Sequence, residues 1–103
     1  MRRPFTQLYL HILWATWDRL PLITPKIEAE VYACIARKCR ENRCEPLAIG
    51  GIEDHVHLLV RFHTAITIGY LIKEVKGASS HLVTHKLTPH EFFKWQGGYG
   101  AFT

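Results

Sequence analysis

The order of its expected strands and helices constrains the fold of this chain more than any other sequence feature. Strand-like alternation of apolar residues and helix-like stripes of apolar residues follow one another along the chain. The order is strand, helix, strand, strand, helix, strand, at about residues 5–17, 25–41, 45–51, 54–62, 67–82 and 92–102. We predict an α+β ferredoxin-like βαββαβ sandwich, in which a four-stranded antiparallel sheet carries both helices on one face.

The two predicted helices have recognisable start signals. Thr24-Pro25 offers a hydroxyl cap followed by proline at the first helical position, and Thr67 offers a second cap. Apolar residues then recur at helical spacing, as Ile27, Val31, Cys34 and Ile35 in the first helix and Ile68, Leu71, Ile72, Val75 and Leu82 in the second. Each helix should therefore bury one side, and Cys34 should lie in the core.

Length and composition favour one globular domain. A chain of 103 residues is long enough for one hydrophobic core and too short for two. The hydrophobic fraction of 48% and the charged fraction of 21% argue against a disordered or fibrous protein. Two arginines precede an early apolar run, but Gln7, His11 and Thr16 interrupt it. We therefore interpret that run as a strand, with neither signal peptide nor membrane span.

The cysteines indicate the redox environment of the protein, and the net charge indicates the class of partner that it could bind. Cys34, Cys39 and Cys44 are an odd number at five-residue steps, which fits neither a zinc knuckle nor a disulfide framework. We expect reduced thiols in a cytoplasmic protein. The net charge of +4 suits a polyanionic partner without requiring one.

Two histidines in the third predicted strand are the main candidates for chemistry. His55 and His57 are two residues apart, so both side chains should point to the face of the sheet opposite to that of Val56 and Leu58. Neighbouring imidazoles can bind one divalent cation. The alternative from spacing alone is a pair of ordinary surface histidines, in a chain that has seven histidines.

The surrounding sequence resembles a known enzyme family. His55-Val56-His57 resembles the HUH motif, and residues 51–60 resemble its setting in the single-tyrosine transposases of bacterial insertion sequences and their REP-associated relatives. Residues 11–16 with Arg19 resemble the family's first strand, residues 76–80 its second helix and residues 95–102 its aromatic strand. The four segments occur in the family's order and cover nearly the whole chain.

This resemblance implies an activity and its partners. Residues 1–103 would form a transposase domain that binds single-stranded or hairpin DNA, as a homodimer. His55 and His57 would hold Mg²⁺ or Mn²⁺ beside the scissile phosphate, and a tyrosine would attack to give a 5′-phosphotyrosine link that is later rejoined to another DNA end. Glu53, Asp54 and His11 are unranked candidates for the second ring nitrogens of the two histidines.

The resemblance also implies DNA-contacting residues. Arg19, Lys73, Lys76, Ser79 and Ser80 are the candidates, although a solvated helix face explains the helical ones equally well. Phe93 and Trp95 would either stack on bases or pack in the core or a dimer. Trp17-Asp18 stands where relatives often carry a basic or polar pair.

The nucleophile and a further metal ligand of the family lie on a helix after the aromatic strand. Because the chain ends at Thr103, we expect a domain that is C-terminally truncated relative to the family. We assign no catalytic residue, since strand or helix positions explain the four tyrosines, Tyr9, Tyr32, Tyr70 and Tyr99. Whether the chain is an enzyme stays open.

Two other functions remain as alternatives. One is a catalytically inactive, domesticated or decayed relative that binds hairpin DNA without cutting it. The other is a metal-dependent hydrolase of small phosphoesters, which would turn over nucleotides without affinity for hairpins. The sequence does not reveal the DNA site, the metal used in the cell or the origin of the truncation.

Overall fold

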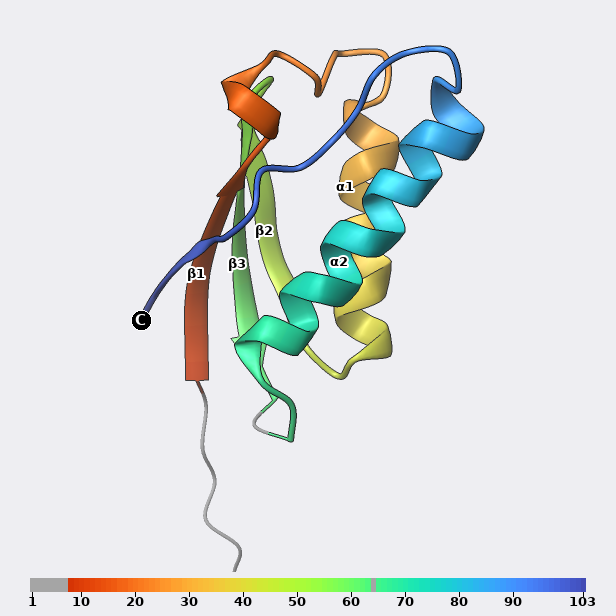
Figure 1. The fold of residues 1–103 in the computed structure, drawn as a ribbon. Coiled ribbons are helices and arrows are strands. Elements are labelled where there is room, and N and C mark those ends of the chain that lie inside the picture. The colour runs from red at the N-terminus through yellow and green to blue at the C-terminus, as the bar shows by residue number, and fades with distance from the viewer. Residues whose placement is uncertain (1–7, 64) are drawn as a thin grey trace, which may run out of the picture.

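The computed structural model describes residues 8–63 and 65–103 as a sheet covered by helices (Figure 1). The predicted strand residues 5–7 lie outside the described residues. The elements are β1 (Leu8–Ala15), η1 (Trp17–Arg19), α1 (Glu28–Glu41), β2 (Glu45–Ile52), β3 (His55–Phe62), α2 (Ile68–Leu82), η2 (Val83–Leu87) and β4 (Gly100–Phe102).

The sheet has the strand order β2-β3-β1-β4, and each neighbouring pair is antiparallel. Both α1 and α2 lie on the same side of it (Figure 1). This is the predicted ferredoxin-like βαββαβ arrangement, which the structure confirms. One face of the sheet is therefore packed against helices, and the other face is open.

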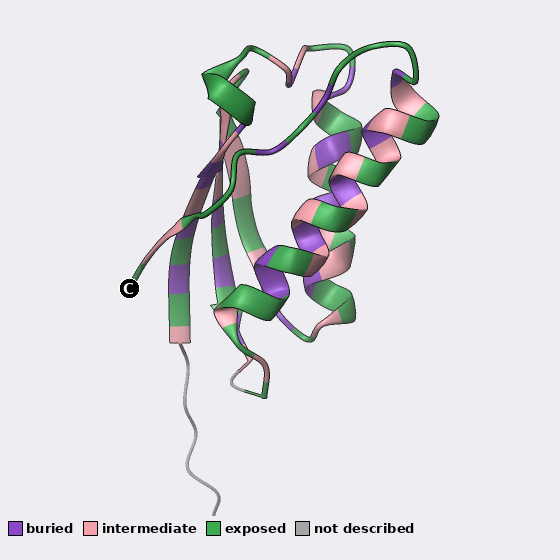
Figure 2. Cartoon of the chain, viewed as in Figure 1, coloured by how far each residue is buried: buried purple, intermediate pink, exposed green. Residues whose placement is uncertain are grey.

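Alternation along the central strands explains which face is covered. In β1, Leu10, Ile12 and Trp14 are at most 3% exposed, and the residues between them are more exposed (Figure 2). In β3 the same pattern buries every second residue from Val56 onward. These side chains pack against the helix stripes, whose buried members include Val31, Cys34, Ile35, Leu71, Ile72 and Val75. The predicted core placement of Cys34 is confirmed.

The structure confirms one of the two predicted helix starts but not the other. Thr67 caps α2 as predicted, since its hydroxyl accepts a hydrogen bond of 3.0 Å from the Tyr70 amide. The predicted start of the first helix was wrong, because α1 begins at Glu28 with no side-chain cap. Residues 25–27 form a turn in which the Ile27 amide donates to the Thr24 carbonyl. The turn buries Ile23 and Ile27, a tertiary gain that outweighs the local cap signal.

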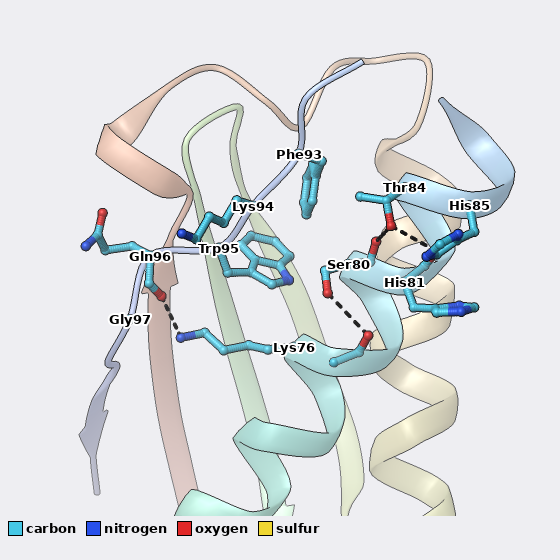
Figure 3. A pocket seen from close by; sticks show the side chains of 11 residues that line it. Lys76, Ser80, His81, Thr84, His85, Phe93, Lys94, Trp95, Gln96 and Gly97 are labelled. Atoms are coloured by element: carbon cyan, nitrogen blue, oxygen red, sulfur yellow. Dashed lines mark hydrogen bonds between the residues drawn. The ribbon is translucent and has the colours of Figure 1, made fainter. Parts of the chain in front are cut away.

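The predicted last strand, residues 92–102, is mostly not a strand. Only Gly100–Phe102 pair with β1, apart from one isolated bridge between Thr16 and Trp95. The Gln96 carbonyl accepts a hydrogen bond of 2.7 Å from the Lys76 ammonium on α2 (Figure 3). The Gly98 carbonyl accepts a second one of 2.8 Å. This contact turns the segment toward the helices.

Side chains before β4 fix this segment in the core. Trp95 is 7% exposed, packs edge-on against Trp14 and Phe93, and donates a hydrogen bond of 3.0 Å to the Ser79 hydroxyl. Of the two readings of Phe93 and Trp95, the structure favours core packing over base stacking.

The cysteines are free and buried, as their spacing indicated. Burial raises the pKa of the Cys39 thiol to about 12, so this thiol stays protonated and unreactive at neutral pH. Across residues 8–63 and 65–103, no helix has the length and apolar character needed to cross a membrane.

Candidate metal centre on the open sheet face

His55 and His57 lie side by side on the open face of β3. Their ring centroids are 4.8 Å apart, and both side chains are half-buried. Val56, Leu58 and Val60 point the other way and are fully buried against the helices. The orientation expected from the HxH spacing is therefore present in the structure.

Each of the two rings has a neighbour at its Nδ1 atom. The Nδ1 of His55 lies 2.8 Å from Asp54 Oδ1, and the Nδ1 of His57 lies 3.1 Å from the Nε2 of His11 on β1. The sequence left three candidate partners for these rings unranked. Asp54 contacts His55 and His11 contacts His57, whereas Glu53 contacts neither ring. Among the described residues, nothing forms a hydrogen bond to the Nε2 atom of either His55 or His57, so both atoms are available to a ligand.

The electrostatics favour metal-competent imidazoles. Desolvation lowers the pKa of His57, and the neighbouring His55 and His11 lower it further. The hydrogen bond from His55, followed by the contact with Arg19, lowers the pKa of Asp54 and keeps it a carboxylate. A neutral imidazole binds cations, and a carboxylate on its other nitrogen raises its basicity and fixes its ring.

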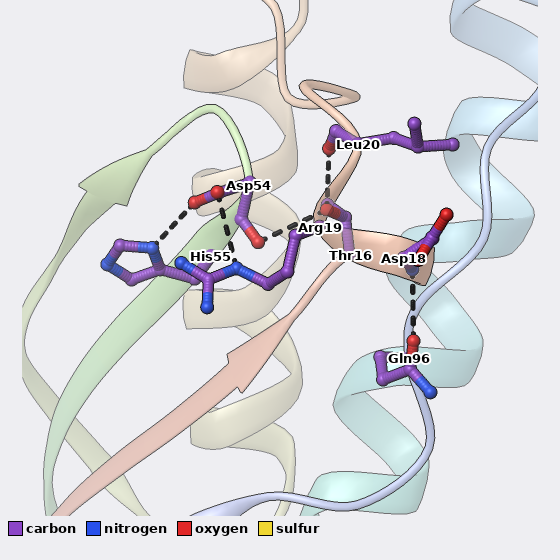
Figure 4. Close-up of polar contacts among 7 residues, drawn as sticks. All are labelled: Thr16, Asp18, Arg19, Leu20, Asp54, His55 and Gln96. Carbon is purple, nitrogen blue, oxygen red and sulfur yellow. Dashed lines mark hydrogen bonds and ion pairs between the residues drawn. The ribbon is translucent and has the colours of Figure 1, made fainter.

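A polar chain holds Asp54 in place (Figure 4). Arg19 Nε lies 3.2 Å from Asp54 Oδ2, and the Arg19 side chain is 63% exposed. Thr16 is fully buried, and its amide donates to the Asp54 carbonyl at 2.9 Å. The Thr16 hydroxyl lies 2.6 Å from the Leu20 carbonyl and 3.1 Å from the Asp54 carbonyl. Thr16 thus ties the segment between β1 and η1, which carries Arg19, to the start of β3.

The backbone on both sides of this chain is constrained. Asp18 and Arg19 have φ values of 54° and 53°, and the Asp18 amide donates to Gln96 Oε1 at 3.0 Å. Gly51 in the β2–β3 hairpin has φ 146°, and a Cβ there would collide with the His55 carbonyl. Only glycine lets the hairpin pass this close to the first histidine.

The donor set fits a divalent cation only in part. His55 and His57 supply two nitrogen donors, but no three His, Cys, Asp or Glu side chains converge within residues 8–63 and 65–103. A cavity of about 280 Å³ adjoins His55, lined by Leu13, Trp14, Ala15 and Arg19. The pair could thus hold a cation whose other positions are taken by water or a substrate.

The five predicted DNA-contacting residues do not converge. Arg19 alone lies near the histidines. Lys73 lines a groove with residues of α1, whereas Lys76 and Ser80 line a different cleft together with residues 93–97. Burial lowers the pKa of Lys76, and its ammonium donates hydrogen bonds to the Gln96 and Gly98 carbonyls. Ser79 is fully buried between Val75 and Trp95, so its hydroxyl does not face solvent.

No tyrosine of the described residues stands beside the histidine pair. The register places Tyr9 opposite Arg61, four residues along β3 from His57, which is about 13 Å. Tyr32 contacts Glu28 on α1, Tyr70 lies on α2, and the Tyr99 hydroxyl approaches Gly69. That none of these four tyrosines is the nucleophile therefore stays a prediction.

Sequence reasoning missed Thr16 as the residue that joins the site. It was interpreted as an interruption of an apolar run, and no local signal distinguishes a surface threonine from one whose hydroxyl reaches two carbonyls of other segments. Its contact with Asp54 spans 38 positions, which only the paired strands reveal.

Comparisons with known proteins agree with the fold and with the family resemblance. The family model described as "Transposase IS200 like" matches residues 4–103. A provisionally named transposase from Deinococcus radiodurans R1 superimposes with a TM-score of 0.86 at 25% identity, over 100% of this chain and 83% of that one. A REP-associated tyrosine transposase solved with a REP hairpin superimposes with a TM-score of 0.71 at 14% identity, over 99% of this chain and 59% of that one.

No curated protein matches the chain. The second structural likeness shows the fold alone, whereas the family model spans nearly the whole sequence. The chain therefore belongs to the IS200-like transposase family.

Proposed function

We propose that this domain binds single-stranded or hairpin DNA on its open sheet face, where His55 and His57 hold Mg²⁺ or Mn²⁺ for strand cleavage and rejoining. The observation that carries the proposal is the adjacent pair of imidazoles, each with Nδ1 engaged and Nε2 left for a ligand. Membership of the transposase family supports the reaction class.

The chain's own residues would prepare the site for a DNA phosphate. Asp54 orients His55, His11 orients His57, and the exposed guanidinium of Arg19 supplies positive charge beside them. A bound cation would polarise the phosphate and stabilise charge on the departing 3′ oxygen. A tyrosine of the complete protein would be the nucleophile, by resemblance to the family.

The proposal includes a homodimer. Leu59, His11 and Phe102 face one another across β3, β1 and β4, and Leu59 and Phe102 are 39% and 59% exposed. The exposed apolar side chains of Leu59 and Phe102 on either side of His11, together with the short edge strand β4, favour contact with a second copy of the chain.

Hairpin binding tests the proposed DNA partner. We expect the protein to bind a labelled hairpin oligonucleotide with a single-stranded flank more tightly than a fully paired duplex of equal length, as measured by fluorescence anisotropy. Affinity should fall with salt, and Arg19→Ala should reduce the salt slope by about 1, because one phosphate contact is lost. Arg40→Ala, an exposed arginine on the helix layer, is the control and should leave the slope unchanged.

The same oligonucleotide distinguishes the two functions when it is incubated with Mn²⁺ and the complete protein, which would carry the proposed nucleophilic tyrosine. A covalent adduct detected by denaturing electrophoresis would support the cleaving enzyme. Hairpin binding without an adduct would favour the inactive hairpin-binding relative, whose supporting observation is that no described tyrosine stands beside the histidines. Equal affinity for duplex and hairpin would contradict both.

Asp54→Asn tests how the site is oriented. We expect Mn²⁺ affinity to fall about 10–100-fold, because the amide no longer draws the Nδ1 proton of His55 and fixes its ring less firmly. Isothermal titration calorimetry measures this change. Asp18→Asn removes an exposed carboxylate from the neighbouring turn and should leave affinity unchanged. If both variants behaved alike, Asp54 would not position the ligand.

A further inference from the structure

A second histidine pair lies at the C-terminal end of the helix layer. His81 is in the last turn of α2 and His85 is in the π-helix η2 that continues it. Their ring centroids are 4.3 Å apart with an interplanar angle of 36°, and both residues are exposed (Figure 3). The four-residue spacing places the two rings on one side of the helical segment.

Neither ring has another partner among the described residues. Within residues 8–63 and 65–103 their rings make a ring contact with each other and no side-chain hydrogen bond or ion pair, and the Thr84 hydroxyl donates to the backbone carbonyls of Ser80 and His81. The segment is anchored from below, because Val83 is fully buried and its carbonyl accepts from the Thr88 amide at 2.9 Å. Two imidazoles are thus held together on a fixed backbone with their nitrogens unused.

The separation of the rings suits shared coordination. With metal-nitrogen bonds of about 2.0–2.1 Å, two imidazoles on one ion have centroids roughly 4.5–5 Å apart. The observed 4.3 Å is close to this range, as is the 4.8 Å of His55 and His57. A small rotation of the exposed rings would complete the fit.

We propose that His81 and His85 form a second divalent-cation site, separate from the pair on the open sheet face. Its ligand class is the nitrogen-preferring late first-row ions Ni²⁺, Cu²⁺ and Zn²⁺, with water in the remaining positions. The site offers no carboxylate partner comparable to Asp54. Basic side chains also line both grooves next to His81, namely Arg37, Lys38, Lys73 and Lys86 on one side, where Glu74 is paired with Lys38, and Lys76 and Lys94 on the other.

These neighbours set the selectivity. The positive charges oppose any cation, and only ions that gain strongly from imidazole nitrogen overcome that repulsion. Mg²⁺ and Mn²⁺ gain less from imidazole nitrogen, and here no carboxylate placed like Asp54 beside His55 offsets the basic side chains, so both ions should bind far more weakly than Ni²⁺. We therefore expect the affinity of His81 and His85 for Ni²⁺ to be much higher than their affinity for Mn²⁺.

Calorimetric titration with NiCl₂ tests the proposal. We expect His81→Ala/His85→Ala to bind one equivalent of Ni²⁺ fewer than the wild-type chain. Each single variant should weaken that equivalent about tenfold or more, because one imidazole remains. Both positions are exposed and helical, so alanine should preserve the thermal unfolding temperature. Excess MgCl₂ should not displace the Ni²⁺.

Two further variants make the result specific. His90→Ala removes another exposed histidine and should leave the Ni²⁺ stoichiometry unchanged. His55→Ala/His57→Ala should keep the equivalent assigned to His81 and His85. Wild-type stoichiometry in His81→Ala/His85→Ala, or an equal loss in His90→Ala, would overturn the second site. Failure of the sheet-face pair to bind metal would instead count only against the proposed transposase site.

Discussion

Replacing His55 and His57 together with alanine is expected to reduce Mn²⁺ binding below detection while the fold stays intact. The two imidazoles are the only described donors that share the open sheet face with free Nε2 atoms beside Asp54 and His11. Without them the carboxylate and the remaining imidazole do not form a ligand set. Calorimetry with MnCl₂ measures the loss.

The fold should tolerate this change because neither ring belongs to the core. Both are half-buried on the open face, whereas the packing of β3 depends on Val56, Leu58 and Val60 on the other face. Circular dichroism should show a thermal transition close to that of the wild type. His81→Ala/His85→Ala is the matched control, and its Mn²⁺ affinity should not change. Undiminished Mn²⁺ binding by the His55→Ala/His57→Ala variant would remove the basis of the proposed function.

Trp95→Ala is expected to lower the free energy of unfolding by about 3–5 kcal/mol, the usual cost of truncating a buried tryptophan. Trp95 packs edge-on against Trp14 and Phe93 at centroid distances of 5.9 and 5.0 Å, and its indole donates to Ser79. Alanine would leave a cavity between β1 and α2 and would remove the hydrogen bond that the Ser79 hydroxyl accepts, although this hydroxyl would still donate to the Val75 carbonyl. Urea unfolding followed by circular dichroism gives the change.

Trp17→Ala is the matched control for this substitution. Trp17 is 40% exposed and its ring lies 4.0 Å from the Lys94 ammonium, so its loss should cost about 1 kcal/mol or less. Similar destabilisation by the two variants would mean that Trp95 does not hold residues 93–98 on the helices.

Residue spacing predicted what depends on periodicity. The HxH spacing was sufficient to place His55 and His57 on one face, and Thr67 was sufficient to start α2, because a pleated strand and a helix cap are local structures. Thr24 and Pro25 gave an equally local signal, yet α1 starts later because burial of Ile23 and Ile27 determines the turn.

By itself, the sequence determined the order of elements, the buried sides of β3, α1 and α2, and the pairing of two imidazoles on β3. Only the tertiary structure decided that Asp54 and His11 are their partners, that Ser79 lies under Trp95 and that Lys76 binds the Gln96 and Gly98 carbonyls. The physical reason is the distance along the sequence between the residues that interact. Periodicity acts between residues a few positions apart, whereas His11 and His57 are 46 positions apart and meet only because β1 pairs with β3.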